Sequence, residues 1–264
     1  NESEAFERVR IRNSLPELAT LGLTPVGISE TAGRMARARV ALEAEASRLL
    51  ATSCSVDPAG YACFDAVSLF SGPDEISLRA LARALLCVGA GEYAPRMAKL
   101  EKLHEKMKAA YQDRVAVWKG ATLAGCRILP LKGRAGVMTF LMCREERSLP
   151  AVLSVWGGME MDWDNRFRLH LRGLKSAENK GTRLQALGRD GWAALCGEAP
   201  SIRRVSVPIA VSMTLPTLVD NEGIVAVPHL NYRRANLNRG DVDFARADFH
   251  PKQTLSGPGF TVAK

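Results

Sequence analysis

Hydrophobic positions in the first 115 residues repeat with the period of an α-helix. Thr24 and Pro25 form a start signal, with Thr as the N-cap and Pro at the first helical position. A hydrophobic residue then recurs every seven positions through an Ala-rich, Arg-studded stretch to about Ala51. The spacing predicts one long amphipathic helix. Its repeating positions are Ile28, Met35, Leu42 and Leu49.

Two more helices are expected in this half. Ser71 should cap the second, with Pro73, Asp74 and Glu75 in its first turn, and Gly89-Ala-Gly91 should end it. The third runs from about Pro95 to Gln112. The buried faces should consist of Leu78, Leu81, Leu85 and Val88 in the second helix, and Met97, Leu100, Leu103 and Met107 in the third. The Pro- and Gly-containing stretch from Ser53 to Tyr61 is interpreted as a turn region.

After Arg114 the pattern changes to alternation and short apolar runs, which indicate strands. One short helix, about Asp190 to Cys196, should interrupt them, and the polar chain beyond Asn231 is interpreted as an irregular tail. The expected strands are Val115–Trp118, Thr122–Leu129, Val137–Arg144, Ala151–Trp156, Phe167–Arg172, Ile202–Val211 and Ile224–Val227. The sequence therefore predicts an α+β fold, a helical N-terminal half followed by a β-rich C-terminal half.

The first residues read as the end of a domain whose body lies upstream. Arg8 and Arg12 share one face of a helix, and Ile11, Leu15 and Leu18 have the spacing of a packed stripe. Pro16 should end or kink that helix. The expected domains are the tail 1–19, a helical domain 20–115, a β-rich domain 116–234 and an irregular tail 235–264.

Charge and cysteine usage narrow the class of protein. Lys and Arg exceed Asp and Glu by 36 − 28 = 8, which suits a polyanionic partner but also fits a merely basic soluble protein. Six cysteines without a Cys-x-x-Cys motif lie among apolar neighbours, as expected of buried thiols in a reduced, cytoplasmic protein. The four histidines lack ligand spacing, so we expect no metal site. Apolar runs of about nine residues are too short to span a membrane.

One loop is similar in sequence to a nucleotide-binding loop. Ser71-Gly72-Pro73-Asp74-Glu75 resembles the Ser-Gly-Gly-x-Asp-Ser loop with which ATP pyrophosphatases bind pyrophosphate. Pro73 has no N–H to donate and Glu75 would repel a phosphate, so helix capping is the better interpretation. No Walker-type or Gly-x-Gly-x-x-Gly motif occurs, and Asp162 and Asp164 have no apolar setting that would make them an acid/base pair. We expect no cofactor and no catalytic residue in this chain.

Two groups of cations are candidates for contacts to nucleic acid. Arg96, Lys99, Lys102 and Lys106 follow one helix face and could track a phosphate backbone, or form a solvated face partly paired with Glu101 and Glu105. In the expected strand from Phe167, Arg166, Arg168, His170 and Arg172 should point away from the core. That row could bind phosphate or protect an edge strand.

Several segments, in their order along the chain, resemble the tRNA(Ile)-lysidine synthetases. They are Asn1 with Phe6, Arg8, Arg12 and Leu15-Pro16; Gly89-Ala-Gly-Glu-Tyr93-Ala-Pro95-Arg96; Arg144-Glu145-x-Arg147; Trp163-Asp164-Asn165-Arg166-Phe167; and more weakly Ala226-Val-Pro-His229 and Phe249-His-Pro with Gly259-Phe260. Arg144-Glu145-x-Arg147 has its simplest role as an ion pair at a strand end, and Asn165, where Gly is usual, tolerates a left-handed turn.

The resemblance implies the C-terminal part of a ligase that uses ATP to join lysine to the wobble cytidine of tRNA(Ile). ATP with Mg, and lysine, would bind an N-terminal domain outside this chain, whose last helix holds Arg8 and Arg12. The implied partner is tRNA(Ile), without a membrane or DNA. The tRNA-contacting residues are expected to be Arg8, Arg12, Arg96, Lys99, Lys102, Arg166 and Arg168, as phosphate binders or orienters. The alternative is a non-catalytic basic module that binds RNA or protein.

Overall fold

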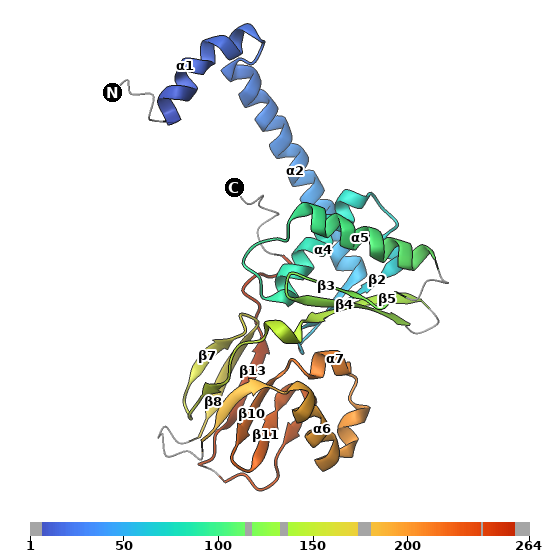
Figure 1. The fold of residues 1–264 in the computed structure, drawn as a ribbon, viewed down its shortest axis with the longest axis vertical. Helices are drawn as coiled ribbons and strands as arrows, with labels where there is room; N and C mark the ends of the chain where they lie inside the picture. Colours follow the sequence, from blue (N-terminus) through green and yellow to red (C-terminus); the bar gives the residue numbers. More distant parts are fainter. Residues whose placement is uncertain (1–6, 114–117, 133–136, 174–180, 239, 257–264) are drawn as a thin grey trace. The chain divides into compact units, whose positions relative to one another are not determined.

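A computed structural model describes residues 7–113, 118–132, 137–173, 181–238 and 240–256. It groups the chain into two compact units, Asn1–Glu45 and Ala46–Lys264. The second unit contains the sheets and the two hydrophobic cores. Figure 1 shows the order of the elements along the chain.

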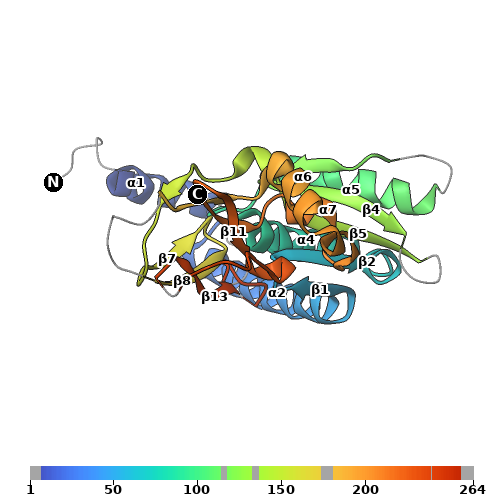
Figure 2. The same cartoon turned by 90° about the horizontal axis from the view of Figure 1, so that it is seen from below.

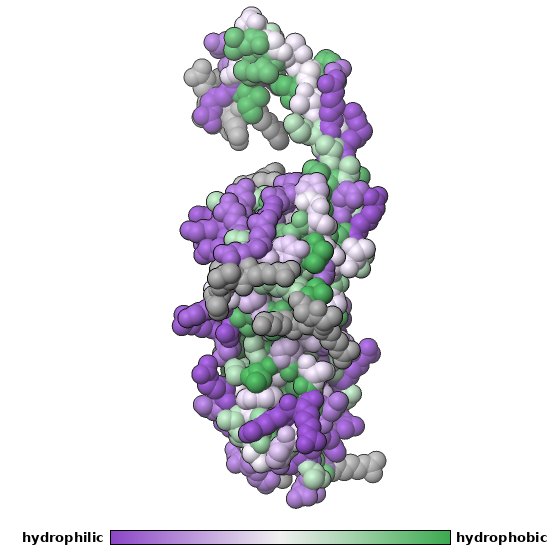
Figure 3. All heavy atoms as spheres, turned by 90° about the vertical axis from the view of Figure 1, so that its right-hand side faces the viewer, coloured by the Kyte–Doolittle hydropathy of each residue, from purple (hydrophilic) through white to green (hydrophobic). Residues whose placement is uncertain are grey.

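The N-terminal unit is formed by α1 (Glu7–Thr20) and most of α2 (Pro25–Ser53). Thr24 is the expected N-cap of α2, since its Oγ1 accepts a hydrogen bond from the Gly27 N–H at 3.1 Å. Of the two outcomes expected at Pro16, the end of the helix is excluded, because α1 continues for four residues beyond it to Thr20, and a kink stays a prediction. Large apolar side chains of this unit are exposed, including Ile28 and Met35 of the predicted stripe, and Figure 3 shows green, hydrophobic surface on these helices.

Sheet A is antiparallel, in the order β1-β2-β5-β4-β3, and α4 and α5 cover one of its faces (Figures 1 and 2). Phe64, Leu81 and Phe140 are fully buried between strands and helices. The strands are β1 (Cys54–Asp57), β2 (Tyr61–Asp65), β3 (Ala121–Leu123), β4 (Cys126–Lys132) and β5 (Met138–Arg144), and the helices are α3 (Ala66–Leu69), α4 (Asp74–Gly89) and α5 (Met97–Gln112).

Two expectations for this sheet need correction. The turn expected over Ser53–Tyr61 is confined to three residues, because strands β1 and β2 flank it as a hairpin. The single strand expected over Thr122–Leu129 is also a hairpin, β3–β4, turning at Ala124 and Gly125, whose φ angles are 51° and 72°. The Pro and Gly residues located the first turn but not the short strands that flank it, and the apolar run over Thr122–Leu129 concealed the second turn.

Helices α4 and α5 confirm the predicted buried faces, except that Met97 is 38% exposed. Asp74 and Glu75 occupy the first turn of α4, and Ala90 ends it in the left-handed region at φ 58°. Ser71 is not the cap: Pro73 holds that position without a side-chain hydrogen bond, and the Ser71 hydroxyl donates back to the Ser68 carbonyl at 2.9 Å.

Sheets B and C enclose the second core, with α6 and α7 packed beside them (Figure 1). Sheet B has the order β12-β11-β10-β9-β6 and sheet C the order β13-β8-β7. The strands are β6 (Leu153–Ser154), β7 (Glu160–Trp163), β8 (Phe167–Arg172), β9 (Arg183–Ala186), β10 (Pro216–Asp220), β11 (Gly223–Val227), β12 (Tyr232–Arg233) and β13 (Asp243–Phe249). The helices are α6 (Gly188–Glu198), α7 (Ile209–Ser212) and the 3-10 turns η2 (Glu146–Ser148), η3 (Pro200–Arg204) and η4 (Pro228–Leu230).

The observed fold confirms the α+β class, and β5, β8, β11 and α6 lie where they were expected. The strand expected over Ile202–Val211 was wrong, since these residues form most of η3 and part of α7. The tail expected to be irregular was also wrong, because β13 pairs with β8 along its whole length. Of Val115–Trp118, all but the last residue lie outside the described residues. The four domain boundaries stay a prediction, although sheet A joins strands from both sides of position 115.

Candidate nucleic-acid interface

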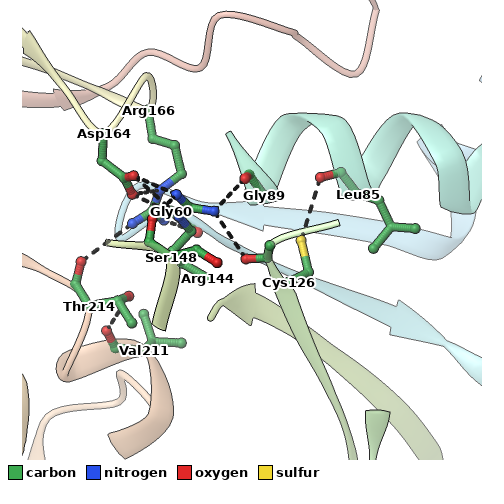
Figure 4. A network of polar contacts seen from close by, with 11 residues as sticks. Gly60, Leu85, Gly89, Cys126, Arg144, Ser148, Asp164, Arg166, Val211 and Thr214 are labelled. Carbon is green, nitrogen blue, oxygen red and sulfur yellow. Dashed lines mark hydrogen bonds and ion pairs between the residues drawn. The ribbon is translucent and has the colours of Figure 1, made fainter. Parts of the chain in front are cut away.

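A buried ionic network lies at the end of β5, in the turn before β8 (Figure 4). The Asp164 carboxylate accepts from Arg144 Nη2 at 2.8 Å and from Arg166 Nε at 2.7 Å. The three side chains are 3%, 9% and 0% exposed for Asp164, Arg144 and Arg166. The expected ion pair at a strand end is therefore confirmed for Arg144.

The two guanidinium groups also bind main-chain carbonyls from distant parts of the chain. Arg144 Nη1 donates to Gly89 O at the end of α4, at 2.5 Å. Arg166 donates to Gly60 O at 3.2 Å and to Thr214 O at 3.4 Å. Burial lowers the pKa of Arg166, and the neighbouring Asp164 carboxylate opposes that shift. Through these hydrogen bonds the network connects α4, the β1–β2 turn and the residues before β10.

Four of the segments that carry the family resemblance meet at or beside this network, those of Gly89, Arg144, Asp164 and His250, whose N–H donates to the Arg166 carbonyl at 2.6 Å. Gly89 begins one of them and contacts Arg144, while Asp164 and Arg166 belong to another. The C-terminal segment joins them, since Lys252 N donates to Asn165 O at 3.0 Å and Lys252 Nζ pairs with Glu92 at 2.5 Å. Asn165 has a φ of 51°, which confirms the left-handed turn expected there.

Helix α5 presents a row of exposed cations above its buried face. Arg96, Lys99 and Lys102 are exposed, whereas Leu100 and Leu103 are buried. Within the described part of the chain, these three cations form no ion pair, and Glu101 and Glu105 do not neutralise them. Their charge is available to a polyanion.

The outer face of sheet C is different, because its cations are paired. Arg168 binds Asp162 with distances of 2.9 and 3.3 Å, and Arg172 binds Asp243 at 2.8 Å. The Arg168–Asp162 hydrogen bonds lower the pKa of Asp162 and raise that of Arg168. Leu169 and the other predicted core positions of β8 are buried as expected. Arg166 does not extend this outward row, since it precedes β8 and points inward (Figure 4).

The remaining candidates lie on α1. Arg12 is exposed, and Arg8 lies in the same helix, but its side chain is outside the described residues. Sequence reasoning did not single out Lys252, which has no motif of its own, or Tyr93 as a contact residue. Tyr93 had a usable signal: it is a lone aromatic directly before the basic helix.

The loop that imitates a nucleotide site does not fit a phosphate group. Pro73 offers no N–H, Ser71 is bound to Ser68 O, and Glu75 pairs with Arg79 at 2.7 Å. Over the described ranges, no group of three or more His, Cys, Asp or Glu side chains has the geometry of a metal site. The described helices include none long and apolar enough to cross a membrane.

Comparisons with known proteins show what the chain is similar to. No family model matches the chain. A tRNA(Ile)-lysidine synthase of Ruegeria pomeroyi is 29% identical over 254 residues, which are 92% of this chain and 53% of that protein. The enzyme of the same name from Wolbachia sp. subsp. Brugia malayi is 24% identical over 250 residues, 92% of this chain and 52% of its own length. One from Methylobacterium sp. is 37% identical over 109 residues, 40% of this chain and 31% of that protein.

These matches confirm the resemblance inferred from the sequence. The chain spans about half the length of the curated relatives that it matches over 92% of its own residues.

Proposed function

From this similarity to tRNA(Ile)-lysidine synthases, we propose that the chain is the tRNA-binding, C-terminal portion of an ATP-dependent ligase. The parent enzyme joins lysine to the wobble cytidine of tRNA(Ile). The observation that carries the proposal is the row of exposed cations Arg96, Lys99 and Lys102, which pair with no described residue, in a chain that matches such enzymes over 92% of its residues. A row of cations without internal partners is what an RNA backbone requires.

The cations have different roles in this proposal. Arg96, Lys99 and Lys102 bind consecutive phosphates, and Arg168 adds a contact once it leaves Asp162. Arg8 and Arg12 bind nearest the anticodon region. Arg166 is fully buried and orients the surface through Asp164 and the Gly60 carbonyl rather than touching RNA.

The chemical steps are assigned to residues outside this chain. ATP, with Mg, supplies the adenylation of the cytidine that lets the lysine amine displace AMP. The described residues offer no loop that fits the triphosphate, since the one similar segment has Pro73 and Glu75 at the critical positions. The chain alone is therefore expected to bind tRNA and to incorporate no lysine.

The test is a titration of tRNA(Ile) against the purified chain at several salt concentrations. We expect log K to fall linearly with log salt, with a slope of roughly −0.7 to −0.9 for each phosphate contact. The Lys99→Ala/Lys102→Ala double variant should lower the magnitude of that slope. The matched control is Arg203→Ala/Arg204→Ala, which removes the same charge from two exposed arginines of η3.

Each other outcome counts against a defined part of the proposal. Binding that is absent or insensitive to salt contradicts the RNA role and favours a protein-interaction module. An equal loss in the control variant contradicts the assignment to α5. Tighter binding to duplex DNA than to tRNA contradicts the partner. Lysine incorporation by the chain alone contradicts the division of labour.

A further inference from the structure

Resting on the proposed function, we propose that Tyr93, Arg96 and Lys99 form a subsite for an unpaired nucleotide of the bound RNA. The Tyr93 ring stacks on the base, and the two cations neutralise the phosphates on either side of it. Backbone contacts alone would accept any polyanion. A stacking position selects a base that is free of its partner, in a loop, in a bulge or at a strand end.

Tyr93 differs from the other three tyrosines in what surrounds its ring. Its side chain is 75% exposed, and in the described part of the chain it forms no hydrogen bond and no ring contact. By contrast, Tyr61 donates to Asp57, Tyr232 donates to Glu198, and Tyr111 stacks on Phe70 with ring centroids 5.7 Å apart. Lys252 interacts electrostatically with Tyr93, but no described aromatic side chain packs on its ring, and an exposed aromatic face is a platform that any base can stack on.

The segment that carries Tyr93 is fixed on both sides. Before it, Gly89 O is bound by Arg144, and Glu92 pairs with Lys252, whose own main chain is bound to Asn165. After it, Pro95 restricts the backbone and α5 begins at Met97. A ring on an anchored segment loses little conformational freedom when a base stacks on it.

The charge around Tyr93 suits a nucleotide. Arg96 follows it by three residues and Lys99 by six, both exposed and without an ion pair to any described residue. Glu92, the acidic neighbour, is neutralised by Lys252. An aromatic ring with adjacent cations is the combination by which proteins hold single-stranded nucleic acid.

The experiment compares Tyr93→Ala, Tyr93→Phe and Arg96→Ala with the unmodified chain. Each is titrated with tRNA(Ile) and with a fully paired RNA duplex of similar length over a range of salt. Tyr93→Ala should weaken tRNA binding by about 5- to 100-fold without changing the salt slope, because stacking involves no phosphate. Tyr93→Phe should restore most of the affinity, and duplex binding should be unaffected by either change.

Arg96→Ala provides the contrast, since it should reduce the magnitude of the salt slope by about 0.7 to 0.9. Unchanged tRNA affinity in Tyr93→Ala, with salt-dependent binding by the unmodified chain, overturns the subsite and leaves the proposed function standing. Failure of Tyr93→Phe to rescue, or an equal loss on the duplex, overturns the stacking role. If the unmodified chain shows no salt-dependent binding of tRNA, the proposed function itself is contradicted.

Discussion

The exposed face of α5 and the outer face of sheet C carry similar cations in opposite electrostatic states. On α5, Lys99 and Lys102 have no acidic partner among the described residues. On sheet C, Arg168 and Arg172 are held by Asp162 and Asp243 from neighbouring strands. A cation that is already paired must exchange one carboxylate for one phosphate, so its net contribution to RNA binding is smaller.

The difference shows that the number of cations in a sequence does not measure the charge that a partner meets. Cross-strand neighbours decide it in a sheet, and their separation along the chain varies: Asp162 is 6 residues from Arg168. Asp243 is 71 residues from Arg172. On a helix, partners three or four residues away can be found in the sequence, although Lys108 of α5 pairs with Asp74, which is 34 residues away. The α5 interpretation could therefore be checked against Glu101 and Glu105, whereas the β8 interpretation could not be checked in this way.

The largest expected effect comes from the buried turn between β7 and β8. Asp164→Asn keeps the size of the side chain and its tolerance of the left-handed conformation at φ 54°, but removes the charge between Arg144 and Arg166. Leaving two buried guanidinium groups without a counter-charge should lower the free energy of unfolding by about 3–5 kcal/mol. Urea denaturation of both proteins measures this difference in the free energy of unfolding.

The matched control is Asp162→Asn, the same change two residues earlier on the exposed pair with Arg168. It should leave the urea midpoint unchanged within error, because solvent screens that pair. Equal midpoints for the two variants would contradict the distinction between the buried network of Asp164 and the exposed Asp162–Arg168 pair.

The next effect concerns the core side of β8, where His229 packs against Phe167 with ring centroids 5.1 Å apart. Burial lowers the pKa of His229 from 6.5 to about 4, so the unfolded chain takes up the proton first as the pH falls. The free energy of unfolding should be unaffected above about pH 7 and decline between about pH 6.5 and pH 4, by on the order of 3 kcal/mol.

His229→Phe removes this titration, and its unfolding free energy should depend less steeply on pH across that interval. Urea denaturation of both proteins at pH 7 and pH 4.5 provides the comparison, since the titration of carboxyl groups is common to them. Parallel pH profiles would show that His229 is not buried in the neutral form.

The smallest expected effect compares the two surfaces directly. Lys99→Ala should reduce the magnitude of the salt slope for tRNA binding by about 0.7 to 0.9, and Arg168→Ala should reduce it less, because Arg168 must first leave Asp162. Asp162→Asn frees Arg168 and should strengthen tRNA binding. An equal or larger effect of Arg168→Ala would place the main contact on sheet C instead of α5.

Helices were the most predictable part of the fold. A long periodic stretch gave α2, α4 and α5 nearly to their ends, because a helix repeats its signal over many turns. A short strand repeats its apolar–polar alternation only about twice, so its signal in the sequence is weaker. Asp243–Phe249 alternates weakly and was interpreted as a tail, and the apolar run before Val211 could equally be a strand or, as observed, a helix opened by Pro208.

The motifs of the candidate site could be found in the sequence. That they lie together in the fold could not be predicted from it. Arg166 was expected to face outward, since it precedes an alternating strand by one residue. Its burial depends on Asp164 in a left-handed turn and on the carbonyl of Gly60, which is 106 residues away. Contacts at such separation leave no local pattern.

The pairing of β2 with β5 has a consequence for how the chain is made. Phe64 lies opposite Phe140, so 140 − 64 = 76 residues must be synthesised before sheet A can close. At about 5–20 residues per second, the β1–β2 hairpin waits for about 4 to 15 seconds while the edge of β2 that will pair with β5 has no strand beside it. During that interval α4 can already form and pack against the hairpin, since α4 lies between the two strands in sequence and contacts both. The nascent chain is thus expected to depend on α4 to cover the apolar face of β2, while the edge of β2 stays unpaired until β5 leaves the ribosome.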